Sequence, residues 1–268
     1  MKKNLKKNLK TNQKQSQSQS QSAIWLCGKH AVFSAIAKKR RKIFSILATK
    51  NSLPELENFL KKKSLSHLGS LIQISDPQKI EFLSGHNLHQ GLAINCSKLP
   101  IKNQFDLLEE LHVLDQNSLP PLVLLDQISD PHNVGAIIRS AVGFGVKKII
   151  FCEHNAPKEN ATIAKSAAGT LEIAELFQVT NFNNLIEKLK KIGYWIVGLA
   201  GEGKVFLSQV KDYENIALII GSEGDGIRDL VKKNCDILAK IKINPDVESL
   251  NASVAASIAL YELMKDKI

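Results

Sequence analysis

The chain has 268 residues, 44% of them hydrophobic, and a formal net charge of +10. This length suits one large domain or two ordinary ones, and the hydrophobic fraction is typical of a soluble globular protein. No apolar run approaches membrane-spanning length, and the four cysteines are scattered, without a CxxC pair or a His cluster at zinc spacing. We therefore expect a cytoplasmic protein with reduced thiols, no metal site and no membrane association.

The positive charge is concentrated in the first third of the chain. Residues 1–22 carry six lysines and no acid, and residues 23–96 carry 11 Lys/Arg against four Asp/Glu. The remainder is slightly acidic, with 19 Lys/Arg against 22 Asp/Glu. A polyanionic partner is expected, most simply nucleic acid, with counterion release supplying much of the affinity.

Residues 1–22 are of low complexity, with lysines followed by alternating Gln and Ser. Such a segment cannot bury enough apolar area to fold, so we expect a disordered basic tail. It serves either as an RNA tether or as a solubilising extension. It is not a secretory signal, because no apolar segment follows the lysines.

Residues 23–96 predict a small α/β domain. Strand-like runs at 24–27, 43–48, 71–74 and 89–94 alternate with helical patterns at 31–37, 53–62 and 79–83. The first helix ends in the basic run 38–42, which favours an RNA surface, although cations are favoured at helix ends in any case. Residues 97–120 show little periodicity and predict a linker with one helix at 105–111.

From residue 121 onward, strands and helices alternate. Strands are predicted at 122–127, 147–152, 173–179, 195–199, 216–220 and 237–243, and helices at 133–144, 160–168, 184–191 and 227–233. This order predicts an α/β domain with a parallel sheet covered on both faces. Ligands of such sheets bind beyond the carboxyl ends of the strands, where three unusual stretches of this chain are placed.

The first stretch is DPHNVGAIIRSAVGFG at residues 130–145. Asp130 is expected to cap a helix that begins at Pro131. Gly135 lies one turn before Arg139, leaving space beside a guanidinium that suits bidentate phosphate binding. The alternative is an ordinary helix cap followed by a surface arginine. The buried stripe of this helix is expected to be Val134, Ile137, Ile138 and Ala141.

The second stretch is LIIGSEGDGI at residues 218–227, a strand that runs into a glycine-rich turn. Its three glycines permit positive φ and close approach of backbone amides to a ligand. A Rossmann dinucleotide loop is the rival interpretation. The spacing, however, is GxxGxG rather than GxGxxG, and the turn comes late in the sheet.

The third stretch is IKINPDVESLNASVAASIAL at residues 241–260. A turn signal at Asn-Pro-Asp precedes a helix that is expected to begin near Ser249, with Leu250, Val254, Ile258 and Tyr261 on its core face. The small residues at 251–257 let another chain segment or a ligand come close. By itself this stretch fits a tightly packed amphipathic helix better than a binding site.

Together, the three stretches resemble the SpoU (TrmH-like) family of RNA ribose 2′-O-methyltransferases, of the SPOUT superfamily, in order and spacing. The resemblance covers residues 121–268, and GKHAV at 28–32 and HQGLAI at 89–94 resemble the family's L30e-like substrate-binding domain. It implies a deep trefoil knot, S-adenosylmethionine as cofactor, an RNA substrate and a homodimer packed through the knot regions. The 23S rRNA guanosine type is resembled most, so rRNA is preferred over tRNA.

The resemblance also implies roles for individual residues. Because a guanidinium stays protonated, we assign Arg139 to an RNA phosphate or the developing alkoxide, with the proton leaving through that phosphate or water. Asn133 and Glu223 are expected to fix Arg139 and the ribose, while Asn251 and Ser253 line the site. The positions that match the cofactor-binding backbone are Gly221, Ile241 and Leu250.

Two residues depart from the family pattern. Lys242 stands where a proline is usual, and Pro245 stands where a glycine is usual. Proline removes an amide donor, so cofactor binding weakens if that amide contacts the cofactor, whereas a solvent-side turn tolerates the change. Residues 165–169 resemble a further segment near the target nucleotide but equally fit a helix end. An RNA-binding protein without catalysis and a Rossmann oxidoreductase are the other functions compatible with the sequence.

Overall fold

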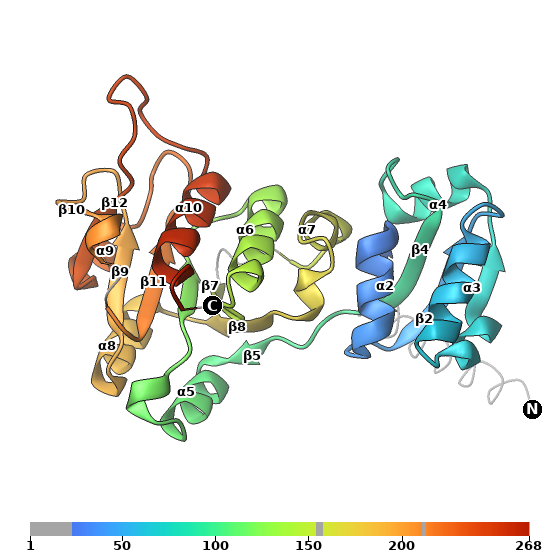
Figure 1. Ribbon diagram of the computed structural model, residues 1–268, viewed down its shortest axis with the longest axis horizontal. Helices are drawn as coiled ribbons and strands as arrows, with labels where there is room; N and C mark the ends of the chain where they lie inside the picture. The colour runs from blue at the N-terminus through green and yellow to red at the C-terminus, as the bar shows by residue number, and fades with distance from the viewer. Residues whose placement is uncertain (1–22, 154–157, 211–212, 268) are drawn as a thin grey trace, which may run out of the picture. The chain divides into compact units, whose positions relative to one another are not determined.

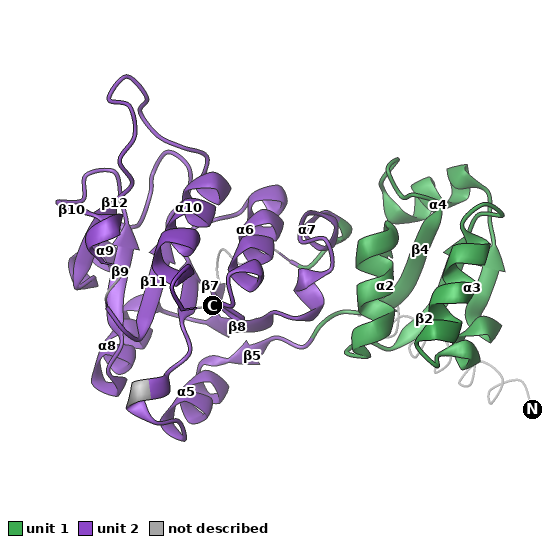
Figure 2. Cartoon of the chain, in the orientation of Figure 1, with its two compact units in different colours: residues 1–99, 159–161 green, residues 100–158, 162–268 purple. Residues whose placement is uncertain are grey.

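The structure is a computed structural model that describes residues 23–153, 158–210 and 213–267. The basic tail predicted for residues 1–22 lies outside the described residues. The chain forms two compact units, one of residues 1–99 with 159–161 and the other of residues 100–158 with 162–268 (Figure 2). Within the described ranges, no helix is long and apolar enough to cross a membrane.

The first unit is a four-stranded sheet in the order β1-β4-β2-β3, with helices packed on it (Figure 1). Strand β4 pairs antiparallel with both β1 and β2, and β2 pairs parallel with β3. The elements predicted from the sequence for this unit are present, with shifted ends. They are β1 (Ala23–Cys27), α2 (Lys29–Lys38), β2 (Ile43–Ala48), α3 (Leu53–Lys62), β3 (Ile72–Ile74), α4 (Pro77–Ser84) and β4 (Leu92–Ser97).

Glu159 belongs to the first unit as part of the short segment 159–161, although the chain before and after this segment belongs to the second unit. Its carboxylate lies 2.5 Å from Arg41 Nη2 and accepts a hydrogen bond from the Leu99 amide at 2.9 Å. Arg41 Nη1 donates to the Ser97 carbonyl at 3.0 Å. The Arg41 and Glu159 side chains are only 0% and 6% exposed. Arg41 is therefore part of the interior of this unit, not of the surface that the basic run 38–42 suggests.

The second unit is built on an eight-stranded sheet in the order β10-β12-β9-β11-β6-β7-β8-β5. Its strand pairs are parallel, which confirms the predicted α/β fold class. Its strands are β5 (Lys102–Asn103), β6 (Leu122–Leu125), β7 (Lys148–Cys152), β8 (Glu175–Val179), β9 (Trp195–Leu199), β10 (Val205–Phe206), β11 (Ile216–Ile220) and β12 (Ile237–Lys240). Its helices are α5 (Gln104–His112), α6 (Pro131–Gly143), α7 (Ala161–Ser166), α8 (Phe182–Ile192), α9 (Asp229–Asn234) and α10 (Ala252–Met264).

Both faces of this sheet are covered. Leu124, Ile150 and Phe177 from the strands form one apolar cluster with side chains of α5, α8 and α9. Helices α6 and α10 pack against each other and contribute no residue to that cluster. The alternate strand residues Val123 and Ile149 are also completely buried. Burial on both faces explains why these strands are almost continuously apolar in sequence.

The linker expected over residues 97–120 differs from the observed structure. Strand β4 extends to Ser97, and the unit boundary falls between Leu99 and Pro100. Strand β5 then joins the sheet beside β8, and α5 buries its leucines in the apolar cluster. Asn103 caps α5 in a capping box with Asp106. The sequence did not predict β5, because a strand of two residues is too short to give an alternating pattern.

Helix α10 corrects two expectations. It begins at Ala252 with Asn251 as its N-cap, rather than near Ser249. The predicted core residues Val254, Ile258 and Tyr261 are 47%, 39% and 53% exposed. The helix instead buries an alanine-rich face, because small side chains let it pack closely on the unit. That buried face consists of Ala252, Ala256, Ala259, Leu260, Leu263 and Met264.

Candidate active site

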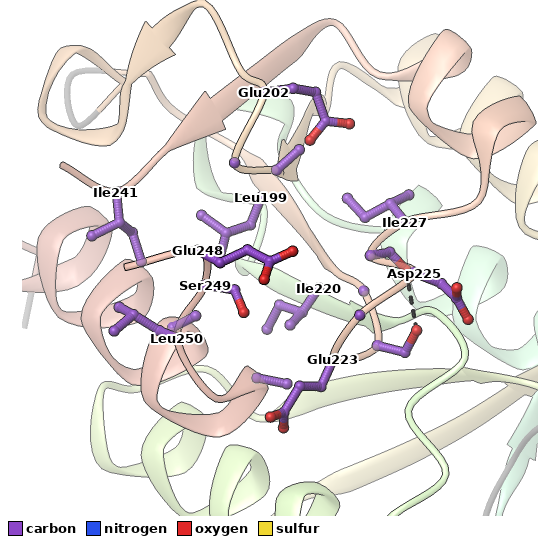
Figure 3. Close-up of a pocket in the computed structure, with 18 of the residues that line it drawn as sticks. Leu199, Glu202, Ile220, Glu223, Asp225, Ile227, Ile241, Glu248, Ser249 and Leu250 are labelled. Carbon is purple, nitrogen blue, oxygen red and sulfur yellow. Dashed lines mark hydrogen bonds between the residues drawn. The ribbon is translucent and has the colours of Figure 1, made fainter. Parts of the chain in front are cut away.

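A cavity of about 340 Å³ lies at the carboxyl ends of β9, β11 and β12, as expected for a parallel sheet. Figure 3 shows apolar side chains and carboxylates around it. The predicted cofactor-binding residues Gly221, Ile241 and Leu250 all line this cavity. Gly221 belongs to the second of the three stretches, and Ile241 and Leu250 belong to the third. Other lining residues include Leu199, Glu202, Ile220, Glu223, Asp225, Ile227, Lys232, Glu248 and Ser249.

The glycine-rich loop after β11 closes on itself beside the cavity. Ser222 and Gly226 exchange backbone hydrogen bonds, both of 3.1 Å, and Gly224 and Gly226 have φ of +94° and +66°. A Cβ on Gly221 would lie 2.1 Å from the Gly226 carbonyl carbon. Glycine at 221 is therefore required by the close approach of the loop's own backbone, and glycines at 224 and 226 by positive φ.

An ion pair between Asp126 and Arg228, which was not predicted from the sequence, holds this loop. Asp126 follows β6 directly and is 0% exposed. It accepts hydrogen bonds from Arg228 Nε at 2.8 Å and from the Arg228 amide at 2.9 Å. The Asp126 amide in turn donates to the Ile220 carbonyl at 2.8 Å. One carboxylate thus ties the end of the glycine-rich loop to the segment that leads to α6.

Glu202 and Lys232 form a second pair on the cavity wall, with 2.6 Å between their charged atoms. The hydrogen bond from Lys232 holds the pKa of Glu202 below its ordinary 4.5. Both residues therefore stay charged at neutral pH. Neither lies in one of the three stretches that the sequence singled out, so no local signal identified them.

Three of the five predicted catalytic residues form one hydrogen-bonded cluster. Asn251 Nδ2 donates to Glu223 Oε2 at 3.0 Å. The Asn251 side-chain oxygen accepts from the Ser253 amide at 3.0 Å and from the Ser253 hydroxyl at 2.7 Å. Asn251 therefore caps α10 and also fixes the carboxylate of Glu223, which lines the cavity.

Arg139 and Asn133 stand apart from this cluster. Arg139 is exposed on α6, and in the described part of the chain it forms no hydrogen bond or ion pair with Asn133 or Glu223. In this structure Glu223 accepts a hydrogen bond from Asn251, and the expectation that Glu223 fixes Arg139 stays a prediction. Helix α6 is nevertheless joined to α10 by a hydrogen bond of 2.7 Å between the Ser140 and Ser257 hydroxyls.

Gly135 has a different role from the one expected. A Cβ at this position would lie 2.5 Å from Ser166 Cβ and 2.7 Å from the Ile163 carbonyl oxygen. The glycine thus allows α7 to pack directly on α6, and does not provide space beside Arg139. Other features of the first stretch are confirmed. Asp130 accepts a hydrogen bond from the His132 amide at 3.0 Å, and Val134, Ile137, Ile138 and Ala141 are buried.

The two departures from the family pattern lie outside the cavity wall. Asn244 to Val247 form a turn, in which the Val247 amide donates to the Asn244 carbonyl at 3.0 Å. Pro245 occupies the second position of this turn, where proline is favoured. Pro245 and Lys242 are exposed, and neither lines the cavity, although Ile241 and Ile243 do. The solvent-side alternative for Pro245 is therefore the one that the structure supports.

Comparison with known proteins decides the family. Residues 120–261 match the SpoU rRNA Methylase family, and residues 25–101 match the RNA 2′-O ribose methyltransferase substrate binding family. The chain belongs to the SpoU rRNA methylase family. It is thus an RNA 2′-O-ribose methyltransferase by family, and the Rossmann oxidoreductase alternative is set aside.

Relatives of this SpoU chain match along most of its length. The 23S rRNA (guanosine-2′-O-)-methyltransferase RlmB of Xylella fastidiosa is 33% identical over 91% of this chain and 96% of its own. The protein of the same name from Coxiella burnetii is 34% identical over 90% of this chain and 94% of its own.

Among solved structures, an AdoMet-bound rRNA methyltransferase from Sinorhizobium meliloti superposes with a TM-score of 0.75 at 19% identity, covering 95% of this chain and 91% of its own. The SpoU methyltransferase AviRb from Streptomyces viridochromogenes, also with AdoMet, gives 0.71 at 20% identity, covering 93% of this chain and 92% of its own. Both share the fold. The trefoil knot and the relation to L30e stay predictions.

Proposed function

We propose that this protein transfers a methyl group from S-adenosylmethionine to the 2′-OH of a guanosine in 23S rRNA. The relatives that match along nearly the whole chain carry this activity in their names. The observation that carries the proposal is the cavity at the strand ends, which adjoins the Glu223–Asn251 hydrogen bond. We also propose a cytoplasmic location, because the proposed substrate, ribosomal RNA, is found there.

The residues around the cavity fit S-adenosylmethionine. Its volume lies in the range of small-molecule sites. Leu199, Ile220 and Ile241 offer apolar surface for an adenine ring, and the carboxylates of Glu202 and Glu248 suit hydroxyl groups and positive charge. Backbone groups at Gly221 and Leu250 would complete the hydrogen bonding. When bound, this cofactor supplies an electrophilic methyl group on a sulfonium.

The chain's own residues then orient the ribose and stabilise charge. They would hold the ribose 2′-OH toward the methyl group that the bound cofactor would supply, and the hydroxyl proton would leave to water or an RNA phosphate. Arg139 is exposed and has no partner among the residues that the structure describes, so we assign its guanidinium to a phosphate or the developing alkoxide. We assign Asn133, on the same helix, to binding of the ribose.

Glu223 differs from Arg139 because its orientation is already set. Asn251 fixes one carboxylate oxygen, and Ser253 fixes Asn251. The proposed role of this trio is to hold a carboxylate at the cavity wall toward the ribose. Asn251 and Ser253 act through Glu223, which makes them positioning residues.

We further propose a homodimer that buries the exposed face of α10. Val254, Ile258 and Tyr261 form an apolar stripe on that helix, and Tyr261 contacts Phe144 of α6 edge-on at 5.8 Å. A second copy with the same stripe would remove this surface from water. Ile258→Glu should convert the dimer to a monomer in sedimentation equilibrium. A wild-type protein that is monomeric at micromolar concentration would refute the proposal.

The activity is tested by methyl transfer from labelled S-adenosylmethionine to total RNA of a strain that lacks this gene, with wild type beside Arg139→Ala. Label in 23S rRNA as an alkali-resistant 2′-O-methyl linkage, absent with the variant, supports the proposal. Label in tRNA would keep the chemistry and change the substrate. No label in any RNA, with RNA binding intact, would indicate a binding protein without catalysis.

A further inference from the structure

The first unit directs two of its helices toward the same end of its sheet. Strands β1 and β2 both pair antiparallel with β4, so they run in the same direction. Helix α2 follows β1 and α3 follows β2, and each returns toward the amino ends of the strands. Phe33 of α2 and Phe59 of α3 stack with their ring centroids 4.3 Å apart. The two helices therefore lie side by side and end together.

Lysines cluster where these two helices end. Since a helix rises about 1.5 Å per residue, Lys38 lies about 7 Å beyond Phe33 along α2, and Lys62 about 4 Å beyond Phe59 along α3. Lys39 has φ of +55°, and Ser64, just after the second group, has φ of +56°, so both helices end in turns that keep the following residues at this end. We call the exposed cations the basic end: Lys38, Lys39, Lys42, Lys61, Lys62 and Lys63.

The charges of the basic end are not neutralised by the fold. In the described residues, no ion pair joins any of these six lysines to a carboxylate, whereas Lys29, at the opposite end of α2, pairs with Glu55 at 2.6 Å. The helix dipole favours cations in the last turn of a helix, which accounts for Lys38, Lys61 and Lys62 but not for the whole cluster. Strand β1 also starts at this end, directly after the six lysines of residues 1–22 in the sequence.

We propose that the basic end binds the phosphate backbone of the RNA substrate, without reading its sequence. This inference rests on the proposed function and specifies which surface of the first unit holds the RNA. Lysines act as point charges on phosphates, and each phosphate contact releases counterions. Arg41 takes no part, because its guanidinium is buried against Glu159.

The test compares two quadruple variants with the same change in net charge. The first replaces Lys38, Lys39, Lys61 and Lys62 by Gln. The matched control replaces four exposed lysines elsewhere by Gln: Lys50, Lys79, Lys147 and Lys191. Binding of an unmodified 23S rRNA transcript is titrated between 50 and 300 mM KCl (about a sixfold range), and methylation kinetics are measured with the same RNA.

The slope of log K against log salt is negative, and in the basic-end variant its magnitude should fall by about three, since each phosphate contact contributes roughly 0.7–0.9. Its KM for RNA should rise at least about tenfold, while kcat at saturating RNA and the Kd for S-adenosylmethionine stay as in wild type. The control should change the slope by less than about one. If the quadruple variant does not fold, the Lys38/Lys39 and Lys61/Lys62 pairs, changed separately, should each lower the magnitude of the slope by about 1.5.

Equal losses in both variants, or an unchanged slope in the basic-end variant, would overturn the inference. So would loss of binding to phosphatidylserine vesicles with RNA binding unchanged, which would make the surface a membrane contact. A wild-type protein that binds the transcript but methylates no RNA would refute the proposed function instead, and the salt slopes would still decide the role of the basic end.

Discussion

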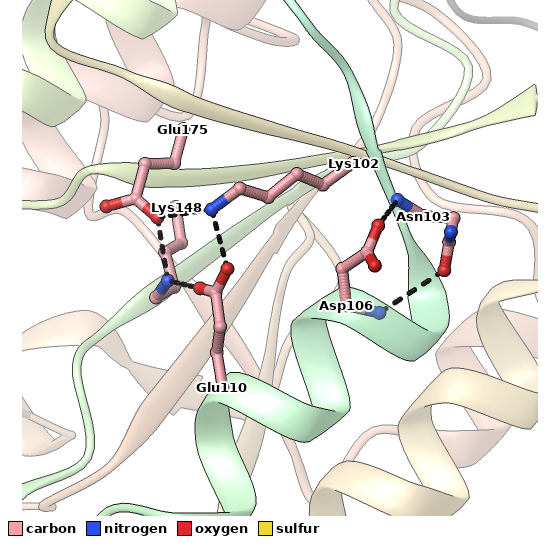
Figure 4. A network of polar contacts seen from close by, with 6 residues as sticks. All are labelled: Lys102, Asn103, Asp106, Glu110, Lys148 and Glu175. Carbon is pink, nitrogen blue, oxygen red and sulfur yellow. Dashed lines mark hydrogen bonds and ion pairs between the residues drawn. The ribbon is translucent and has the colours of Figure 1, made fainter.

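The two ends of the eight-stranded sheet differ in how many of their charged side chains form ion pairs. At the amino end, Lys148 and Glu175 begin β7 and β8, and Glu110 of α5 and Lys102 of β5 join them (Figure 4). Lys148 contacts both carboxylates, and Lys102 lies 2.6 Å from Glu110, so all four charges have partners. On α6, which follows the carboxyl end of β6, Arg139 and Asn133 have no such partners among the described residues. Charges that satisfy one another stabilise the fold, whereas charges left to solvent are available to a substrate.

The carboxyl end also contains two ion pairs, Asp126–Arg228 and Glu202–Lys232. Of these, Asp126–Arg228 is the more buried, and breaking it should have the largest effect on stability. Arg228→Ala leaves a completely buried carboxylate with only backbone partners. Removal of one member of a buried pair costs about 3–5 kcal/mol, and we expect about 3 because Arg228 itself is partly exposed. Chemical denaturation measures this loss, and the Kd for S-adenosylmethionine should rise because the glycine-rich loop loses its anchor.

The matched variant is Lys240→Ala, which removes a cation at the end of β12 that forms no ion pair within the described residues. A similar loss in both variants would assign the effect to surface charge. Stability of Arg228→Ala within about 0.5 kcal/mol of wild type would show that the pair does not hold the loop.

Arg139, which has no ion-pair partner in the described part of the chain, should behave in the opposite way. Arg139→Ala should lower kcat about 100- to 1,000-fold, equivalent to roughly 2.7–4 kcal/mol, because a charge-stabilising donor is lost. Its melting temperature and its Kd for S-adenosylmethionine should match wild type, since no internal contact is removed. Single-turnover kinetics with thermal denaturation separate the two effects. A variant that loses stability in proportion to activity would place Arg139 among the structural residues.

At the amino end, Glu110→Gln should lower stability by about 1 kcal/mol and leave activity unchanged. Partial burial alone would raise the pKa of Glu110, but hydrogen bonds from Lys102 and Lys148 outweigh it and hold that pKa below its ordinary 4.5. A carboxyl with a depressed pKa stabilises the fold above its ordinary pKa and loses this contribution as the pH falls through the folded value.

The pH dependence provides the check. The difference in unfolding free energy between wild type and Glu110→Gln should be constant from pH 7 to about pH 5.5 and should shrink below pH 4.5. A difference that persists unchanged at pH 3 would show that packing, and not the charge of Glu110, causes the loss.

The sequence was sufficient for the parts of the structure that depend on local pattern. Apolar runs located the central strands, and Asp130-Pro131 located the start of α6, because caps and periodicity act over a few residues. The cofactor-binding positions Gly221, Ile241 and Leu250 were predicted by family resemblance, and they line one cavity.

What the sequence did not provide depends on which helix faces meet. The stripe Val254–Tyr261 has helical spacing, yet α10 buries its alanines instead, because small side chains allow close packing that hydrophobicity alone does not rank. The Asp126–Arg228 pair joins residues 102 positions apart, so no window of sequence contains both. Gly135 was assigned to Arg139 for the same reason, since its true neighbour, α7, is distant in the chain.

Substitution of Pro245 should have the smallest effect, and it tests whether the turn that contains Pro245 belongs to the cofactor site. Pro245→Gly should leave the Kd for S-adenosylmethionine within about twofold of wild type, because the turn formed by Asn244 to Val247 does not line the cavity. It should lower stability by about 0.4–1 kcal/mol, since glycine raises the entropy of the unfolded chain. Ile241→Ala, four residues away but on the cavity wall, should weaken cofactor binding measurably in the same calorimetric titration. Tighter binding of S-adenosylmethionine by Pro245→Gly would mean that a backbone amide at position 245 contacts the cofactor. The turn from Asn244 to Val247 would then be part of the cofactor site.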